Sequence, residues 1–529
     1  MAAVAGMTTN ATTRTKATDE ATLRQVTLAS SLGTLFEWYD FYLYGSLASF
    51  FGGLFFPAGN ETAQFLASLA TFGAGFAVRP VGAVFFGRLG DVVGRKYSFL
   101  LTIMIMGVST AAIGLLPTYS DVGTLAPVLL VSMRLLQGLA LGGEYGGAVS
   151  YVAEYAPPDR KGYFTGYVQT TATLGLMLSL LVIMGTRVYL GETEFRMWGW
   201  RQPFFLSFVL LGVSVYLRLS LRETPMFRDL MANDQKSKGP VGEALFSWRY
   251  GKWVLLALFG ATAGQAVIWY GGQFYALYFL TATLKVDYRT AYTLLIIALA
   301  AGTPFFVVFG SLSDRIGRKP IIMLGLLIAA ITYIPIYKGL TSAANPKLAK
   351  AIDSSPVTLI EPAACEAKCE KAREFLVKAG VPFTSEPGDD LGMKVAGADS
   401  KGFTAAEWKK NLNAAGYPDA AKPEDISKVT VVLLLFVLVI FVTMVYGPIA
   451  AFLCELFPTR IRYTGLSVPY HFGNGWFGGF TPLIGTSITA STGNIYAGLY
   501  WMIGVALMSL VIGGLLLPET KDRALDSDI

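Results

Sequence analysis

The sequence predicts an all-α membrane protein with twelve transmembrane helices. Hydrophobic residues make up 53% of the chain and charged residues only 15%, with a mean hydropathy of +0.51, which is more apolar surface than one water-soluble core could bury. Ser98 to Thr118 is an uncharged run long enough to cross a bilayer as a helix, whereas a transmembrane barrel would need segments of about ten residues with alternating polarity. A ten-residue motif also recurs in both halves of the chain, which predicts two related helical bundles.

Apolar stretches between charged breaks define the predicted spans. They cover residues 26–56, 62–87, 98–117, 124–152, 164–187, 202–219, 252–281, 290–312, 320–338, 428–456, 464–489 and 495–517. Lys and Arg gather in the short connections on the side of both termini, so we expect that side to be cytoplasmic. The loops near Arg196 and Lys285 weaken this contrast.

The motif GRLGDVVGRK at residues 87–96 recurs as GSLSDRIGRK at 310–319, and AEYAPPDRKGYFTG around Glu154 is echoed by CELFPTRIRYTG around Glu455. The offset between the copies grows from 223 to 301 residues, so a segment is inserted between spans nine and ten of the second half.

The predicted organisation follows from the spans and the repeat. It comprises a disordered cytoplasmic tail (1–25), an N-terminal six-helix bundle (26–219), a cytoplasmic linker (220–251), a C-terminal six-helix bundle (252–339 and 428–517), an extracytoplasmic insertion (340–427) and a cytoplasmic tail (518–529).

Twelve helices, with Gly-x-x-x-Asp-x-x-Gly-Arg-Lys between the second and third helix of each half, resemble the major facilitator superfamily. Within it, EWYDFYLYG at 37–45 and the stretches at 76–91 and 134–148 resemble the metabolite:proton symporters. Members of that family import osmolytes, 2-oxoglutarate, citrate, shikimate and related metabolites. The resemblance implies binding between two bundles that rock to alternate access. Val92 departs from the loop motif, which usually has Arg or Lys there, and this suggests a looser first loop.

The resemblance further implies that both loop motifs close the cytoplasmic face. In this sequence the motif residues are Gly87, Asp91, Gly94, Arg95 and Lys96, with Glu154 as an expected partner, and Gly310, Asp314, Arg315, Gly317 and Arg318. Asp91 is expected near a helix N-terminus, where backbone dipoles stabilise an acid. The alternative is that these residues only set topology and form surface ion pairs, which are weak individually.

Charged residues within the spans are the candidates for proton coupling, because an unpaired ion at membrane depth is costly. Glu37 and Asp40 lie in span one, and Arg134 and Glu144 in span four. We expect Asp40 to carry the proton with Arg134 as a switchable partner, since Arg-x-x-Gln-Gly resembles the arginine motif of proton-driven facilitators. A static ion-pair network is the alternative, and it is about as good an explanation for Glu37 and Glu144.

Arg79 in span two is the candidate for gripping a substrate carboxylate, because a planar guanidinium matches that group bidentately. Other polar and aromatic residues could surround the substrate: Tyr44, Gln137, Gln265, Trp269, Tyr270 and Gln273. Tyr275 and Tyr278 are better explained as interfacial aromatics. His471, the only histidine, could relay protons, although a structural hydrogen bond explains it as well.

The insertion contains Cys365 and Cys369, which could form a disulfide in an oxidising compartment, whereas the lack of nearby histidines and of a second cysteine pair argues against a metal site there. Cys454 has no neighbouring cysteine. KCEKAREFLVKAG and FTAAEWKKNLNAAG each predict a short amphipathic helix, so the insertion is expected to be a small folded cap.

The sequence has no Gly-x-x-x-x-Gly-Lys-Ser/Thr loop and no catalytic constellation, so we expect neither an enzyme nor a cofactor, with a proton gradient as the energy source. The expected partners are the bilayer, protons and a small carboxylate or zwitterion, with no nucleic acid and a monomeric chain. A proton-coupled exporter is one alternative, although span five lacks the Gly-Pro pair of such exporters. A transporter-like sensor or receptor is the other.

Overall fold

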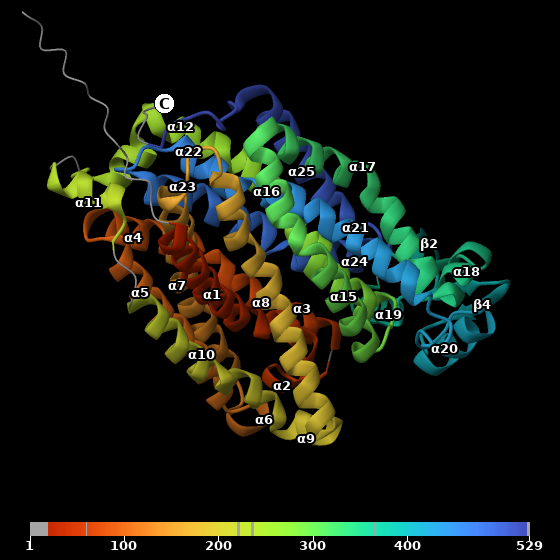
Figure 1. Cartoon of the computed structure of the whole chain (residues 1–529). Coiled ribbons are helices and arrows are strands. Elements are labelled where there is room, and N and C mark those ends of the chain that lie inside the picture. Colours follow the sequence, from red (N-terminus) through yellow and green to blue (C-terminus); the bar gives the residue numbers. More distant parts are fainter. Residues whose placement is uncertain (1–19, 60, 220–222, 234–236, 364, 526–529) are drawn as a thin grey trace, which may run out of the picture.

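The computed structural model describes residues 20–59, 61–219, 223–233, 237–363 and 365–525. Its helices form two bundles that lie side by side, with a small α/β unit at one end (Figure 1). Residues 1–19 of the predicted N-terminal tail and 526–529 of the C-terminal tail lie outside the described ranges. The other six residues of the predicted N-terminal tail already belong to the first helix, which begins at Glu20.

The first bundle contains six long helical stretches and some short turns between them. Its elements are α1 (Glu20–Ser46), α2 (Ala48–Phe55), α3 (Glu61–Ala77), α4 (Arg79–Val92), α5 (Arg95–Leu115), α6 (Tyr119–Val122), α7 (Leu125–Tyr155), α8 (Lys161–Leu190), α9 (Glu192–Met197), η1 (Gly199–Arg201) and α10 (Gln202–Leu219). The connection that follows holds α11 (Pro225–Ala232) and η2 (Gly242–Phe246).

The second bundle repeats this plan with more irregular helices. It comprises α12 (Trp248–Ala257), η3 (Leu258–Thr262), α13 (Ala263–Tyr270), η4 (Gly271–Tyr275), α14 (Ala276–Tyr278), η5 (Phe279–Thr283), α15 (Tyr288–Gly302), α16 (Pro304–Ile316), α17 (Arg318–Ala344), α21 (Lys428–Tyr446), α22 (Ile449–Leu456), α23 (Arg462–Phe472), η6 (Gly473–Gly478), α24 (Thr481–Thr492) and α25 (Leu499–Leu516). The segments η3, η4, η5 and η6 are π-type turns inside longer helices, a feature that is frequent at functional sites.

Ten helical stretches of the described chain are long and apolar enough to cross a membrane. The first and eleventh predicted spans are helical as well, at α1–α2 and α23–η6–α24, but they fall outside this set. These two stretches carry Glu37, Asp40, His471 and Asn474, all buried. The fold therefore agrees with the predicted twelve helices, and its two least apolar helices hold polar groups inside the protein.

The segment between α17 and α21 folds into a four-stranded sheet with helices. Its elements are α18 (Pro346–Ser354), β1 (Val357–Glu361), α19 (Glu366–Ala379), β2 (Phe383–Pro387), β3 (Gly392–Val395), β4 (Ala398–Lys401) and α20 (Ala405–Ala414), with strand order β2-β1-β3-β4. Strands β1 and β2 are parallel and are joined through α19, while β1–β3 and β3–β4 are antiparallel. The two amphipathic helices predicted for the insertion are α19 and α20, whereas the strands were not predicted.

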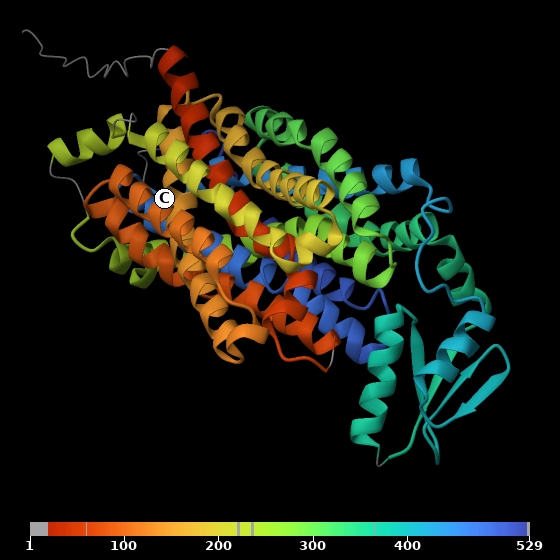
Figure 2. The same ribbon diagram turned by 90° about the horizontal axis from the view of Figure 1, so that it is seen from below.

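Figure 2 shows this insertion projecting from one end of the bundles, whereas α11 lies at the opposite end. We call these the insertion end and the linker end. Backbone hydrogen bonds tie the insertion to the second bundle: Phe383 N donates to Gly493 O at 3.1 Å, and Ala421 N donates to Lys285 O at 3.1 Å. A disulfide joins Cys365 to Cys369 at the start of α19. The insertion is thus attached to the second bundle.

The two bundles approach most closely where small residues meet. Helix α8 packs along α16, and a side chain at Gly162 would overlap the carbonyl oxygen of Gly310, as one at Gly310 would overlap that of Gly162. Such small-residue contacts let helices in membranes approach closely. Gly310 is one of the predicted motif glycines, and its counterpart Gly87 packs in the same way against the backbone of Thr464, with a would-be side-chain carbon 3.2 Å from Thr464 Cα.

Candidate functional site

Arg79 lies at the break between α3 and α4, and its side chain is fully buried. Pro80 follows it in the first turn of α4, where a missing N–H costs no helical hydrogen bond. The Nε atom donates to Nδ1 of His471 at 3.2 Å. Both Nη atoms are buried and have no hydrogen-bond partner among the described residues. An arginine has five N–H donors in a planar fork, so the unoccupied edge can bind a carboxylate with two hydrogen bonds.

His471 contributes the contact from the second bundle. It lies in α23, and because Nδ1 accepts the hydrogen bond from Arg79, the neutral ring carries its proton on Nε2. Nε2 is buried and has no hydrogen-bond partner in the described chain. A buried polar contact between side chains 392 positions apart therefore joins the two bundles. Sequence reasoning did not pair these two residues.

Aromatic rings from both bundles surround the Arg79 guanidinium. The ring of Phe76 lies 5.1 Å from its central carbon, and Tyr270 meets Phe76 edge-on with centroids 5.2 Å apart. Tyr42 of α1 stacks on Trp269 of α13 at 5.3 Å. Two of the predicted substrate residues, Trp269 and Tyr270, thus lie in the same aromatic group as Arg79. Rings in this arrangement provide an apolar wall and favourable cation–π contacts.

The predicted glutamines of the second bundle, Gln265 and Gln273, lie in the helical stretch that also carries Trp269 and Tyr270. Gln265 and Asn474 exchange two hydrogen bonds, at 3.1 and 3.4 Å. Gln273, in the π-type turn η4, donates to Thr173 of α8 at 3.2 Å. Each amide is therefore engaged with a protein partner in this conformation, and Gln273 spans the two bundles.

Arg134 forms a second buried cationic centre, inside the first bundle. Its Nη1 donates to Phe41 O at 3.3 Å and to Gln137 Oε1 at 2.5 Å. The guanidinium carbon lies 4.3 Å from the Phe41 ring centre and 4.8 Å from that of Tyr44. The predicted substrate residues Tyr44 and Gln137 therefore accompany Arg134 and not Arg79. Nε and Nη2 of Arg134 have no hydrogen-bond partner within the described residues.

Asp40 is buried but does not pair with Arg134 in this conformation. Its Oδ1 accepts a hydrogen bond from Ser207 of α10 at 2.5 Å. Successive residues of a helix point in directions about 100° apart, so α1 presents Asp40 to α10 and the neighbouring Phe41 to Arg134. The expected Asp40–Arg134 pair is not formed here. Glu37 and Glu144 are buried as well, as predicted for charged residues that avoid lipid.

At the linker end, the two loop acids cap helices of the opposite bundle. Asp91 accepts from Tyr463 N at 3.3 Å, Thr464 N at 3.0 Å and Thr464 Oγ1 at 2.7 Å, in the first turn of α23. Asp314 accepts from Gly162 N and Tyr163 N, both at 2.8 Å, in the first turn of α8. Acids are stabilised at helix N-termini, and here each cap also joins the two bundles.

Ion pairs between the bundles accompany these caps. Glu154 of α7 pairs with Arg462 at 2.6 Å, and Glu455 of α22 pairs with Lys161 at 2.8 Å. Within the second bundle, Arg318 pairs with Asp314 at 2.6 Å and with Glu455 at 3.1 Å, and so joins the cap to the Lys161 pair. Because these side chains are almost completely buried, the pairs are shielded from screening by salt.

The structure tests one of the two bases expected to pair with Glu154. Lys96 does not pair with it, whereas Arg462 of the opposite bundle does. Lys96 instead donates from Nζ to Leu219 O at 2.8 Å, at the end of its own bundle. The side chain of Arg95 lies outside what the structure describes, and Arg315 is exposed. Gly94 and Gly317 have φ of +133° and +109°, so both loops need the turn geometry that glycine allows.

The internal repeat could have identified the missed partners. Lys161 and Arg462 occupy equivalent positions of the repeat around Glu154 and Glu455, and each acid pairs with the base of the other copy. The caps are exchanged in the same way. If each acid had been assigned to the equivalent base in the other copy of the repeat, both ion pairs would have been predicted.

We expect Asp314→Asn to separate the linker ends of the two bundles. An amide accepts fewer and weaker hydrogen bonds from two N–H donors than a carboxylate does, which should raise the population of separated linker ends about tenfold. Pulsed electron paramagnetic resonance between spin-labelled cysteines at Asp159 and Ile316, both exposed, measures that separation.

Asp121→Asn is the matched control, since Asp121 caps the short helix α6 within one bundle at the insertion end. The labelled distance should stay unchanged in this control. An unchanged distance distribution in Asp314→Asn as well would contradict a role for the cap in holding the bundles together.

Known proteins resemble this chain in sequence and in fold. Residues 26–239 and 414–527 match the model of the "Sugar (and other) transporter" family. The glycine betaine/proline/ectoine/pipecolic acid transporter OusA of Dickeya dadantii is 30% identical over 96% of this chain and 85% of its own length. The citrate-proton symporter of Salmonella typhi is 28% identical over 95% of this chain and 96% of its own length.

A solved structure of the xylose symporter XylE, a major facilitator protein, aligns with 96% of this chain and 98% of its own, with a TM-score of 0.63 and 17% identity. This likeness concerns the fold alone. Together with the family match over more than half of the residues, it identifies the chain as a multi-pass membrane transporter and not an enzyme. The chain belongs to the sugar (and other) transporter family, and it has the fold of the major facilitator superfamily.

Proposed function

We propose that this protein imports a small polar metabolite that bears a carboxylate, as a free acid or as part of a zwitterion, together with protons. The observation that carries the proposal is Arg79, whose guanidinium edge is buried between the two bundles without a hydrogen-bond partner in the described chain. Buried polar groups are normally satisfied, and a substrate carboxylate would satisfy this one. The proton gradient supplies the energy, and no cofactor is needed.

The names of the relatives support this substrate class. One is named for glycine betaine, proline, ectoine and pipecolic acid, and another for citrate with protons. All of these compounds carry at least one carboxylate, the group that a planar guanidinium binds best. The aromatic rings around Arg79 would then contact the rest of the substrate, and a quaternary ammonium could lie against such rings.

Asp40 is the proposed proton carrier. Its only described hydrogen-bond donor is the neutral hydroxyl of Ser207, and an ionised carboxylate at membrane depth is costly without a cationic partner. Uptake of a proton removes that cost. Arg134 would serve as its partner in another conformation, with Glu37 and Glu144 in the same bundle. His471 is a second candidate, because its protonation would remove the acceptor of Arg79 and release the guanidinium.

The two ends of the protein differ as an alternating-access mechanism requires, with one end closed and the other open to a cavity. The caps and ion pairs close the linker end, while a cavity of about 770 Å³ lies at the insertion end. We propose that the linker end faces the cytoplasm, with both termini, and that the loop motifs are its gate. In a rocking mechanism these contacts break as the linker ends separate.

Export and sensing remain the rival functions, and uptake by reconstituted vesicles separates them. We expect vesicles with an acidic exterior to accumulate at least one compound from a panel of citrate, 2-oxoglutarate, glycine betaine and proline. The accumulation should collapse when a protonophore dissipates the gradient. A receptor would bind without accumulating, and an exporter would extrude its substrate in exchange for inward protons.

Replacing Arg79 with Lys should weaken substrate recognition. A lysine keeps the charge but cannot offer two parallel donors, so KM should rise about tenfold to a hundredfold, which corresponds to the loss of a charged hydrogen bond. The measurement is initial uptake as a function of substrate concentration. Arg201→Lys is the matched control, because Arg201 lies in the same bundle and its hydrogen bond in the described chain goes to the Leu116 carbonyl. An unchanged KM for Arg79→Lys would place the substrate elsewhere.

Asp40→Asn should abolish proton-driven accumulation and leave exchange of substrate measurable, because an amide cannot take up and release the proton. Accumulation and counterflow are compared in the same vesicles, with Asp121→Asn as control. Full accumulation by the Asp40 variant would move the coupling site to Glu37, Glu144 or His471.

A further inference from the structure

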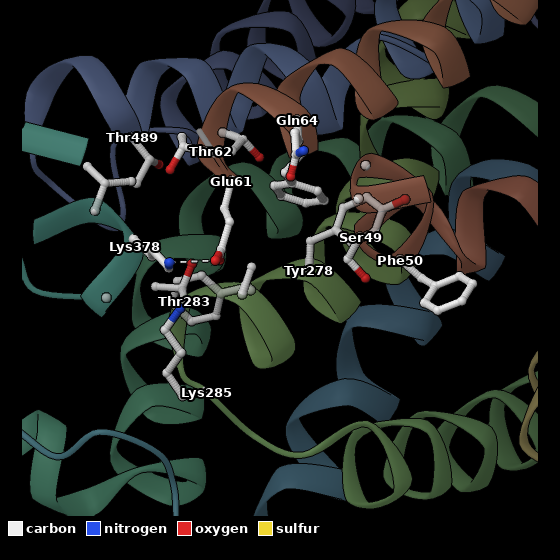
Figure 3. Close-up of a pocket in the computed structure, with 18 of the residues that line it drawn as sticks. Ser49, Phe50, Glu61, Thr62, Gln64, Tyr278, Thr283, Lys285, Lys378 and Thr489 are labelled. Carbon is white, nitrogen blue, oxygen red and sulfur yellow. Dashed lines mark ion pairs between the residues drawn. The ribbon is translucent and has the colours of Figure 1, made fainter. Parts of the chain in front are cut away.

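The cavity at the insertion end is formed by all three parts of the protein. Helices α2 and α3 of the first bundle, η5 and α24 of the second, and α19 of the insertion line its volume of about 770 Å³. Figure 3 shows polar side chains from these elements around the cavity, among them Glu61, Thr62, Lys285, Lys378 and Thr489. The size is within the range of small-molecule sites.

Cationic side chains outnumber acidic ones in the wall of this cavity. Arg187, Arg196, Lys285 and Lys378 line it, and Glu61 is the one acid among the described lining residues. Glu192, next to the cavity, pairs with both arginines at 2.6 and 2.9 Å, so one acid compensates two cations only in part. Together with Glu61, two acids face four cationic side chains, and the resulting net positive charge of the cavity favours an anion.

The two lysines differ in how they are compensated. Lys378 of α19 pairs with Glu61 of α3 at 2.8 Å, as the dashed line in Figure 3 shows. Both partners are exposed by more than half, and an ion pair so exposed is weak. Lys285 is half-buried, and its ammonium has no ion pair or hydrogen bond of its own among the described residues, although the charge of Glu61 acts on it. Burial, and next the neighbouring charge of Lys378, lower the pKa of Lys285 to about 8.

The backbone holds Lys285 in an unusual conformation. Its φ of +57° lies in the left-handed region, which non-glycine residues seldom adopt. The insertion fixes this turn, because Ala421 N donates to Lys285 O at 3.1 Å and Asn345 Nδ2 donates to Leu284 O at 3.0 Å. Strained conformations that the surrounding structure enforces are concentrated at functional sites. The insertion therefore holds in the cavity wall an ammonium that has no ion-pair partner of its own among the described residues.

A closure separates this cavity from the central site. Tyr278 lines the cavity, and its hydroxyl donates to Gly45 O at 2.6 Å, which joins the second bundle to α1. One turn before it, Phe274 belongs to the central aromatic group, with its ring 5.1 Å from that of Tyr42. A ligand in the cavity thus lies on the outer side of this contact, before the bundles have opened toward Arg79.

We propose that the cavity is an entrance subsite for the carboxylate of the transported metabolite, held by Lys285 and Lys378 before it passes to Arg79. The proposal rests on the proposed function for the identity of the substrate. The carboxylate displaces Glu61 from Lys378, so it also releases an ion pair between the insertion and the first bundle. Binding of the substrate carboxylate then also weakens the contacts that hold the insertion end closed.

The test compares variants whose expected effects have opposite signs. Lys285→Gln should raise the KM for uptake of the acid or zwitterion found in the panel about three- to tenfold, whereas Lys285→Arg, which keeps the charge, should not. Glu61→Gln should lower KM, because it removes the competing carboxylate. Lys409→Gln is the matched control, since Lys409 is an exposed lysine of the same insertion that pairs with Asp419, away from the cavity. If Lys285 and Glu61 were only structural, both variants would impair uptake alike, and that result would overturn the subsite.

A binding measurement without transport separates this inference from the proposed function. The rate of reductive methylation of each lysine in the whole protein is measured by peptide mass spectrometry. It is compared in the presence of glycine betaine, of citrate and of choline, which lacks the carboxylate. Glycine betaine and citrate should slow methylation of Lys285 at least about threefold, choline should not, and Lys409 should be unaffected. Protection without proton-driven uptake in any vesicle assay would refute the proposed function alone. Uptake by the wild type without protection of Lys285 would refute the subsite alone.

Discussion

A charged group in the interior of a membrane protein must be given partners by the protein itself, and that constraint organises this structure. Arg79 meets it with one hydrogen bond to His471 and with aromatic rings on its remaining faces. The partner comes from the other bundle, so the same contact that compensates the cation also holds the bundles together. An arrangement of this kind is sensitive to any anion that reaches the guanidinium, because a charged hydrogen bond is stronger than a neutral one.

At the linker end, too, buried charged groups have partners from the opposite bundle, and here the buried groups are acids. Each loop carboxylate takes backbone N–H donors from a helix of the opposite bundle, and each buried acid of α7 or α22 takes a base from the other side. The two sets of contacts are related by the internal repeat. Each copy of the repeat therefore supplies both donors and acceptors to the interface, and each acid meets the base or the helix N-terminus of the other copy.

The twelve helices, the two bundles and the position of the insertion were predictable because apolar length, basic loops and repeat spacing are local features of the sequence. Arg79, Trp269 and Tyr270 were predicted for their chemistry in one substrate group that also held Tyr44, Gln137, Gln265 and Gln273. Those four contact Arg134, Asn474 or Thr173 instead. The partner of Asp40 was not, since the choice between Ser207 and Arg134 depends on how α1 is rotated against α7 and α10. The strands of the insertion were missed because they have four or five residues each and mostly polar faces, as in Phe383–Pro387 and Ala398–Lys401.

The low hydropathy of the first helical stretch has a consequence for biogenesis. A nascent segment with two carboxyl groups near its centre partitions poorly from the translocon into lipid, since each charged side chain costs about 2.5–3.5 kcal/mol there. The hydroxyl that satisfies Asp40 is synthesised 167 residues later, in α10. The N-terminal segment therefore gains its full complement of partners only when the sixth span has emerged, and membrane integration of the first bundle becomes a cooperative and late event.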